Sequence, residues 1–154
     1  MESEIRRYTE LVKKRLASLR LMARELRECR DSFIKMDLES IRRHVSYQGS
    51  LCSEIQALDD ELKTVKCQLA VGFGLDLRTM SDDAFHERFD AESRAQLHQL
   101  LDDLADTRDS VRRLKRIYAG MLKRSRHTID ILLNTMASYA GVYGPPGRSV
   151  WRMP

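Results

Sequence analysis

Histidines, cysteines and carboxylates are the side chains of this sequence that could do chemistry. The four histidines are His44, His86, His98 and His127. They stand far apart, form no HExxH or HxxxH motif, and have no cysteine at the spacing of a shared metal site. The histidines therefore predict neither a metal site nor a cofactor.

Three pairs of adjacent aspartates could serve as general acid and base, namely Asp59-Asp60, Asp82-Asp83 and Asp102-Asp103. Neighbouring residues on a helix point about 100° apart, so such pairs are typical of surface charge and not of an acid–base dyad. The sequence Gly72-Phe73-Gly74 lacks the third glycine and the lysine of a phosphate-binding loop. We therefore expect that the protein is not an enzyme.

The three cysteines, Cys29, Cys52 and Cys67, are odd in number and form no CxxC motif. All three lie at or next to apolar positions of helical patterns, which predicts small buried thiols in a reducing compartment. The N-terminus lacks the apolar core of a signal peptide, and no run of about 18 apolar residues could cross a membrane. We expect a cytoplasmic protein without membrane insertion.

The amino-acid composition predicts long helices. Any functional site of the protein is therefore expected to be positioned by helices. The 154 residues are 6% aromatic and 32% charged, which is typical of a helical bundle or coiled coil. Residues 3–36 and 38–71 each carry apolar side chains at alternating steps of three and four. Asp37 is a predicted N-cap of the second helix, and the glycines after Val71 are its predicted stop.

A third long helix is predicted from Asp90 to Ala140, where there is no proline and a single glycine. A short helix capped by Ser81 is expected before it, with Phe85 and Phe89 as a plug over the end of the bundle. The predicted fold class is all-α, an elongated antiparallel bundle of three long helices with a short helix between the second and the third. Residues 1–140 would form one helical bundle domain, and residues 141–154 a flexible tail that contains glycine and proline.

Formal charge divides sharply along the chain, from −6 over residues 72–109 to +8 over residues 110–154. The densest basic run lies between Arg112 and Arg126. Tyr118 is its one interleaved aromatic residue, which gives little support to base stacking, and the acidic block would oppose a phosphate backbone. We predict a solvated basic face that pairs with the acidic half of the same chain. A nucleic-acid-binding helix ranks third among the functions that we consider.

Apolar residues near the end of the last predicted helix form a candidate site for binding a client protein. Their spacing of three and four places them on one side of the helix, and methionines suit a surface that repacks on different partners. The same residues could also close the bundle or form a dimer seam, and this alternative stays open. We call them the apolar stripe: Met121, Leu122, Ile129, Leu132, Leu133 and Met136.

The C-terminal part of the sequence carries two motifs of a known family. Residues 118–125 are Tyr-Ala-Gly-Met-Leu-Lys-Arg-Ser, and residues 143–147 are Tyr-Gly-Pro-Pro-Gly. This part resembles the end of the FlgN family of flagellar type III export chaperones, whose last helix shows an Asn-x-x-Leu-Leu-x-x-Ser pattern before a Tyr-Gly-x-x-Gly or similar tail. Tyr118 stands here in place of the asparagine, and Met121-Leu122 in place of the two leucines.

The resemblance implies a cytoplasmic helical chaperone that binds the C-terminal amphipathic segment of hook-associated proteins, which are the hook–filament junction proteins. It would keep these clients unpolymerised and deliver them to the type III export gate, which the tail would contact through Tyr143. The alternative is a structural or adaptor coiled coil that oligomerises through the same apolar stripe. The chaperone would bind its client as a monomer or a weakly associated small dimer, whereas the adaptor would self-associate strongly.

Overall fold

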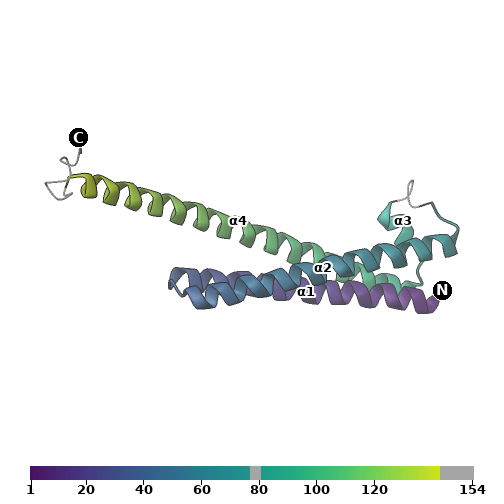
Figure 1. Cartoon of the computed structure of the whole chain (residues 1–154). Helices are drawn as coiled ribbons and strands as arrows, with labels where there is room; N and C mark the ends of the chain where they lie inside the picture. The colour runs from purple at the N-terminus through teal and green to yellow at the C-terminus, as the bar shows by residue number, and fades with distance from the viewer. Residues whose placement is uncertain (77–80, 143–154) are drawn as a thin grey trace, which may run out of the picture. The chain divides into compact units, whose positions relative to one another are not determined.

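The computed structural model describes residues 1–76 and 81–142 of the chain, with side chains as far as residue 136. The regular structure in these ranges is entirely helical, without a strand, which confirms the predicted all-α class. Three of the described helices are long and one is short (Figure 1). They are α1 (Glu2–Ile34), α2 (Leu38–Phe73), α3 (Asp82–His86) and α4 (Ala91–Val142).

Helix α2 begins and ends at the residues where the sequence predicts a cap and a stop. The Ser40 backbone N–H donates to Asp37 Oδ1 at 3.1 Å, and hydrogen bonding from Ser40 lowers the pKa of Asp37. Gly74 has a φ of +68°, the left-handed conformation that favours glycine after the last turn of a helix. Both predictions are confirmed, although α1 ends at Ile34 and not at Met36.

Helices α3 and α4 begin with caps of the same kind. The Ala84 backbone N–H donates to Ser81 Oγ at 3.3 Å, and the Ser93 backbone N–H donates to Asp90 Oδ1 at 2.8 Å. These side chains satisfy backbone donors that the first turn of a helix leaves without partners. The predicted starts of the short helix and of the last long helix are therefore confirmed.

The chain divides into two compact units, residues 1–116 and a second unit that begins at residue 117. Within the first unit α1 and α2 lie side by side and run antiparallel. Arg7 Nη2 lies 2.6 Å from Glu61 Oε1, and further along α1 Glu25 Oε2 lies 2.8 Å from His44 Nδ1. The residue numbers of these partners fall along α2 as they rise along α1, which fixes the opposite directions of the two helices.

The core of the first unit consists of two apolar clusters, to which α1, α2 and the part of α4 before residue 117 all contribute. Leu97 of α4 is buried in the first cluster, and Leu104 and Val111 are buried in the second. The first part of α4 therefore packs along the other two helices through one apolar side. The remaining α1 and α2 members of the clusters are Ile5, Tyr8, Leu11, Val12, Val65, Leu69 and Ala70 in the first, and Leu16, Leu19, Met22, Ala23, Leu26 and Leu51 in the second.

The second unit, taken by itself, is described as the part of α4 from Ile117 to Val142. The division between the two units falls inside α4, whereas the sequence predicts one domain over residues 1–140, and this domain prediction stays a prediction. Residues 143–154 of the predicted tail lie outside the described residues. Tyr143, the predicted contact with the export gate, is among them.

Candidate functional site

The apolar stripe lies on the helix of the second unit with most of its side chains exposed. The exposed fraction rises from 44% at Leu122 to 67% at Met136, while Met121 is half-buried. At about 100° per residue the six side chains fall within about 120° of the helix circumference, so they share one face. Ile117 and Ile131 are exposed as well but project outside this face. The stripe is therefore available for contact with another molecule.

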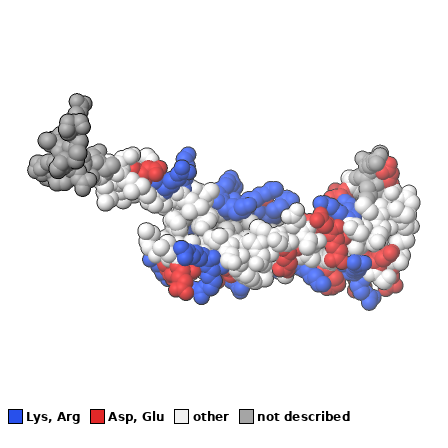
Figure 2. Space-filling model, viewed as in Figure 1, with Lys and Arg blue, Asp and Glu red and all other residues white. Residues whose placement is uncertain are grey.

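Basic side chains occupy the remaining circumference of the same helix. Lys123 and Arg124 are exposed and, by the same helical repeat, project away from the apolar stripe, whereas exposed Arg126 lies at its edge. Figure 2 shows Lys and Arg side chains gathered along α4. Among the residues with described side chains, the basic run forms one ion pair, in which Arg112 Nη1 lies 3.6 Å from Asp109 Oδ1. The pairing with the acidic half therefore involves Arg112 within the first unit, and it stays a prediction for Lys123, Arg124 and Arg126, which belong to the second unit.

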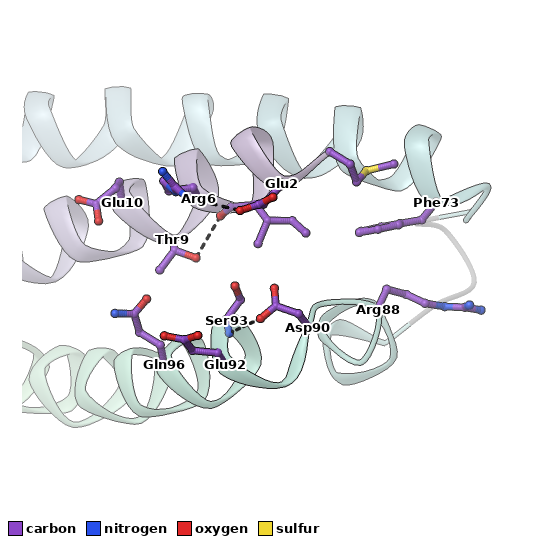
Figure 3. A pocket seen from close by; sticks show the side chains of 12 residues that line it. Glu2, Arg6, Thr9, Glu10, Phe73, Arg88, Asp90, Glu92, Ser93 and Gln96 are labelled. Atoms are coloured by element: carbon purple, nitrogen blue, oxygen red, sulfur yellow. Dashed lines mark hydrogen bonds and ion pairs between the residues drawn. The ribbon is translucent and has the colours of Figure 1, made fainter.

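A cavity of about 570 Å³ lies between the start of α1, the end of α2 and the start of α4 (Figure 3). Two of its carboxylates have structural roles. Arg6 Nη2 donates to Glu2 Oε1 at 3.4 Å, and Asp90 caps α4, where the hydrogen bond from the Ser93 backbone lowers the pKa of Asp90. The lining contains no histidine or cysteine that could act as a base or nucleophile. We assign no catalytic chemistry to this cavity.

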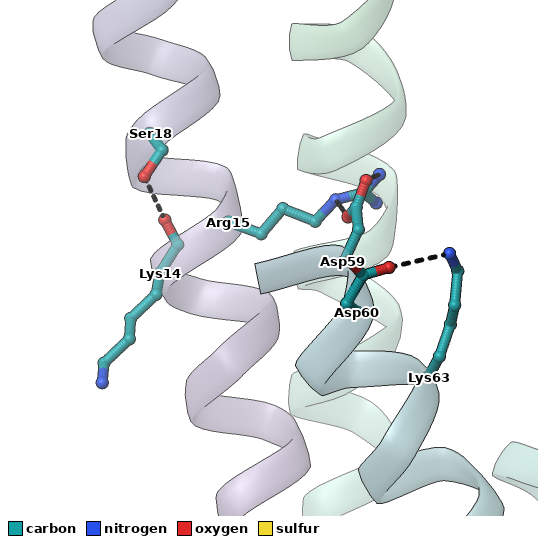
Figure 4. Close-up of polar contacts among 6 residues, drawn as sticks. All are labelled: Lys14, Arg15, Ser18, Asp59, Asp60 and Lys63. Atoms are coloured by element: carbon teal, nitrogen blue, oxygen red, sulfur yellow. Dashed lines mark hydrogen bonds and ion pairs between the residues drawn. The ribbon is translucent and has the colours of Figure 1, made fainter. Parts of the chain in front are cut away.

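A second cavity, of about 460 Å³, lies between α1, α2 and the first part of α4. Polar residues at its edge form ion pairs (Figure 4). Arg15 Nη2 donates to Asp59 Oδ2 at 3.2 Å, and Lys63 Nζ donates to Asp60 Oδ1 at 3.1 Å. Arg15 interrupts the apolar pattern of α1, and the structure pairs its charge with Asp59 of α2. The apolar residues of the cavity were outside the predicted binding site; they are Leu19, Met22, Leu26, Ile55 and Val111.

Aromatic rings close one end of the first unit. The ring centroid of Phe85 lies 5.3 Å from that of Phe89 and 5.9 Å from that of Tyr8, and Phe73 adjoins both phenylalanines. Burial raises the pKa of Tyr8 to about 12, so its hydroxyl stays protonated near neutral pH. Phe85 and Phe89 are both buried, which confirms their predicted role as a plug.

His86 adds a titratable group to this aromatic cluster. Its ring nitrogens are buried and have no hydrogen-bond partner among the described residues. Burial lowers the pKa of His86 below its ordinary value, because it disfavours the imidazolium, and nearby Asp82 only partly opposes this effect. Below about pH 6.5 the unfolded chain therefore binds a proton that the folded chain does not bind.

We expect the free energy of unfolding to fall as the pH drops below about 6.5, by at most about 1.4 kcal/mol per pH unit from this group. His86→Phe should flatten that part of the profile, since it removes the titrating group and keeps a ring in the cluster. Urea denaturation across this pH range measures the effect. His127→Gln, at an exposed position, is the control and should leave the slope unchanged. If the free energy of unfolding of His86→Phe still falls as steeply below about pH 6.5, the pH dependence does not come from His86.

Three side chains of the first unit could together hold a metal ion, although the sequence predicts none. One ligand atom from each of Glu25, Glu28 and His44 lies within 4.8 Å of the others. Sequence reasoning missed the group because His44 lies on a different helix, 19 residues after Glu25. The one signal that could have found it is the antiparallel pairing of α1 and α2, which places these positions opposite each other.

The cysteines differ from the sequence prediction. Cys29 is buried as predicted, but Cys52 and Cys67 are exposed. Cys52 directly follows Leu51, which is buried, and adjacent residues on a helix project about 100° apart. A cysteine next to an apolar position therefore need not share its burial. The prediction of buried thiols is wrong for these two residues.

Comparisons of the chain with known protein families, with curated proteins and with solved structures find no match. The resemblance to the FlgN family therefore rests on residues 118–125 and 143–147. No helix in the described ranges, 1–76 and 81–142, has both the length and the apolar character needed to cross a membrane.

Proposed function

We propose that this protein is a non-enzymatic export chaperone of the FlgN type, which holds an amphipathic segment of a client protein on the apolar stripe. The observation that carries the proposal is the row of exposed large apolar side chains on α4, from Leu122 to Met136. Large apolar side chains that lie together on a surface mark an interaction site. The motif at residues 118–125 falls on the same helix and supports the choice of family.

Burial of apolar surface would provide the binding energy. A client segment with apolar residues at helical spacing would cover the stripe, as amphipathic helices do in other complexes. Each Å² of apolar surface removed from water contributes about 25 cal/mol, against which the ordering of the client segment must be set. Met121 and Met136 would let the surface adapt to more than one client. Basic residues such as Lys123 and Arg126 would attract an acidic end of the client before contact.

The proposed clients are hook-associated proteins, held unpolymerised in the cytoplasm and passed to the type III export gate through Tyr143. The proposal includes the finer fold, an elongated antiparallel bundle of three long helices that carries the stripe on its last helix. Burial of Leu97, Leu104 and Val111 against α1 and α2 supports the bundle in the first unit. The tail motif at residues 143–147 supports the contact with the gate.

Isothermal titration of the full chain with the C-terminal segment of a hook-associated protein from the same genome tests the proposal. We expect sub-micromolar binding with a negative heat-capacity change, because apolar surface is buried in the complex. Leu132→Asp combined with Met136→Asp should abolish this binding, since both changes place a carboxylate on the apolar stripe.

The matched control combines Ala119→Asp with His127→Asp. It introduces the same two carboxylates at exposed positions of the same helix, outside the apolar face. Helical content by circular dichroism should be alike in both double variants, and the control should keep most of the affinity. The proposal fails if the unaltered chain does not bind the segment, or if the two double variants bind it equally well.

A structural coiled coil that self-associates through the same stripe is the second candidate. The observation that favours it is the spacing of Leu122, Ser125, Ile129, Leu132 and Met136, which follows steps of three and four as in a coiled-coil seam. Sedimentation equilibrium separates the two functions. A tight dimer that Leu132→Asp plus Met136→Asp dissociates, together with no client binding, would favour the coiled coil.

A further inference from the structure

Three potential metal ligands meet where α1 and α2 lie side by side in the first unit. Glu25 and Glu28 project from α1 and His44 projects from α2, with one ligand atom of each within 4.8 Å of the others. From this juxtaposition we propose that Glu25, Glu28 and His44 bind a divalent transition-metal ion such as Zn²⁺.

The donor set selects the class of ion. Two carboxylates and one imidazole are ligands that Zn²⁺ and its first-row neighbours accept. Calcium and magnesium prefer oxygen ligands throughout, so the imidazole of His44 argues against them. Three protein ligands would leave at least one position on the ion for water.

Burial makes Glu25 a strong ligand. The residue is 6% exposed, and a buried carboxylate must be compensated by a partner. That partner is His44, whose Nδ1 lies 2.8 Å from Glu25 Oε2. A metal ion would bind Glu25 Oε2 and His44 Nδ1 in place of this contact, with the imidazole proton on Nε2. Because metal ligands must be deprotonated, binding should weaken as the pH falls.

Glu28 completes the site by a side-chain rotation. Ligand atoms on a tetrahedral ion with bonds of about 2.0–2.2 Å lie roughly 3.4 Å apart, closer than the 4.8 Å limit of the present arrangement. Glu25 Oε2 and His44 Nδ1 lie closer than this, at 2.8 Å, so these two atoms would separate slightly on binding, and Glu28 would turn toward them. Its side chain is exposed, and its ion pair with Arg24 is long, at 3.8 Å, so it can turn toward the other two ligands.

Competition between the full chain and a chromogenic chelator for Zn²⁺ tests the proposal. The background variant carries Cys52→Ser and Cys67→Ser, because these exposed thiols could bind Zn²⁺ by themselves. We expect one ion per chain in this background, bound with an affinity that falls as the pH falls. Cobalt as a probe should give a visible spectrum of nitrogen and oxygen ligation, without the strong sulfur charge-transfer absorption of thiolate sites.

Single substitutions identify the ligands. His44→Ala and Glu28→Gln should each weaken Zn²⁺ binding at least tenfold, since loss of even a second-shell partner costs about 10- to 100-fold. Glu28→Gln alters an exposed side chain, so it tests the site even if His44→Ala fails to fold. The control is His127→Ala, which removes an exposed imidazole from the other unit and should leave the affinity unchanged.

Two results would overturn the proposal. One is the absence of stoichiometric Zn²⁺ binding once the two exposed cysteines are replaced, which would leave the Glu25–His44 contact as a purely structural hydrogen bond. The other is equal affinity in the unaltered background, His44→Ala and Glu28→Gln. Neither result depends on client binding, so failure of the metal site is distinguishable from failure of the proposed chaperone function.

Discussion

Replacing Phe85 by alanine is expected to lower the free energy of unfolding by about 3–5 kcal/mol. The side chain is fully buried, and its ring contacts those of Tyr8, Phe73 and Phe89. Truncation would remove the buried ring and leave a cavity between elements that are far apart in the sequence, which limits how far they can collapse into the space. Edge-to-face contacts of about 0.5–1.5 kcal/mol would be lost as well.

Urea denaturation followed by circular dichroism measures this effect. The control is Tyr47→Ala, an aromatic truncation at an exposed position of α2, which should change the free energy of unfolding by less than about 0.5 kcal/mol. The free energy of unfolding of a typical protein is about 5–15 kcal/mol, so a loss near the upper end of the range could unfold the chain. Phe85→Leu removes less of the buried side chain and serves as a milder second variant. If Phe85→Ala and Tyr47→Ala lower the free energy of unfolding equally, the role of Phe85 as a buried plug is contradicted.

The helix ends were predictable because their signals are local. Asp37, Ser81 and Asp90 each cap a helix through a backbone N–H three residues further along the chain. Gly74 ends α2 through its own backbone conformation. In each case the cause lies within one turn of the helix, so residue type and spacing were sufficient.

Contacts between helices were not predictable in the same way. Glu25 and His44 come together because α1 and α2 run antiparallel, and the sequence does not state which positions of two helices face each other. The pairing of Arg15 with Asp59 was not predictable for the same reason, since the two residues lie on different helices. A repeated apolar pattern indicates that a helix packs on something, but it does not indicate the register.

The apolar stripe was predictable only in part. Helical spacing was enough to place Met121, Leu122 and the residues up to Met136 on one face. Spacing could not tell whether that face is buried, because Leu97 and Leu104 belong to the same kind of pattern and lie in the core. Which apolar faces are covered is a property of the three-dimensional structure, and the spacing of the residues does not reveal it.

Two leucines of α4 should respond very differently to the same substitution. Leu97→Ala is expected to lower the free energy of unfolding by about 2–5 kcal/mol, since Leu97 is fully buried in the first apolar cluster. Leu132→Ala should change it by less than about 0.5 kcal/mol, because Leu132 is 56% exposed. Both variants lose the same atoms from the same helix, so the difference in their effects measures burial alone. Urea denaturation of the two variants at one pH provides the comparison.

The comparison also separates stability from binding. If the stripe serves a client, Leu132→Ala should weaken the binding of the hook-associated segment while the free energy of unfolding stays nearly constant. If Leu132→Ala instead destabilises the chain as much as Leu97→Ala, the stripe belongs to the core of the protein or to an obligate dimer. Repeating the denaturation at two protein concentrations distinguishes these two cases, because the stability of an obligate dimer rises with concentration. A concentration-independent loss would remove the basis of the chaperone proposal, since a side chain that packs in the monomer is not available to a client.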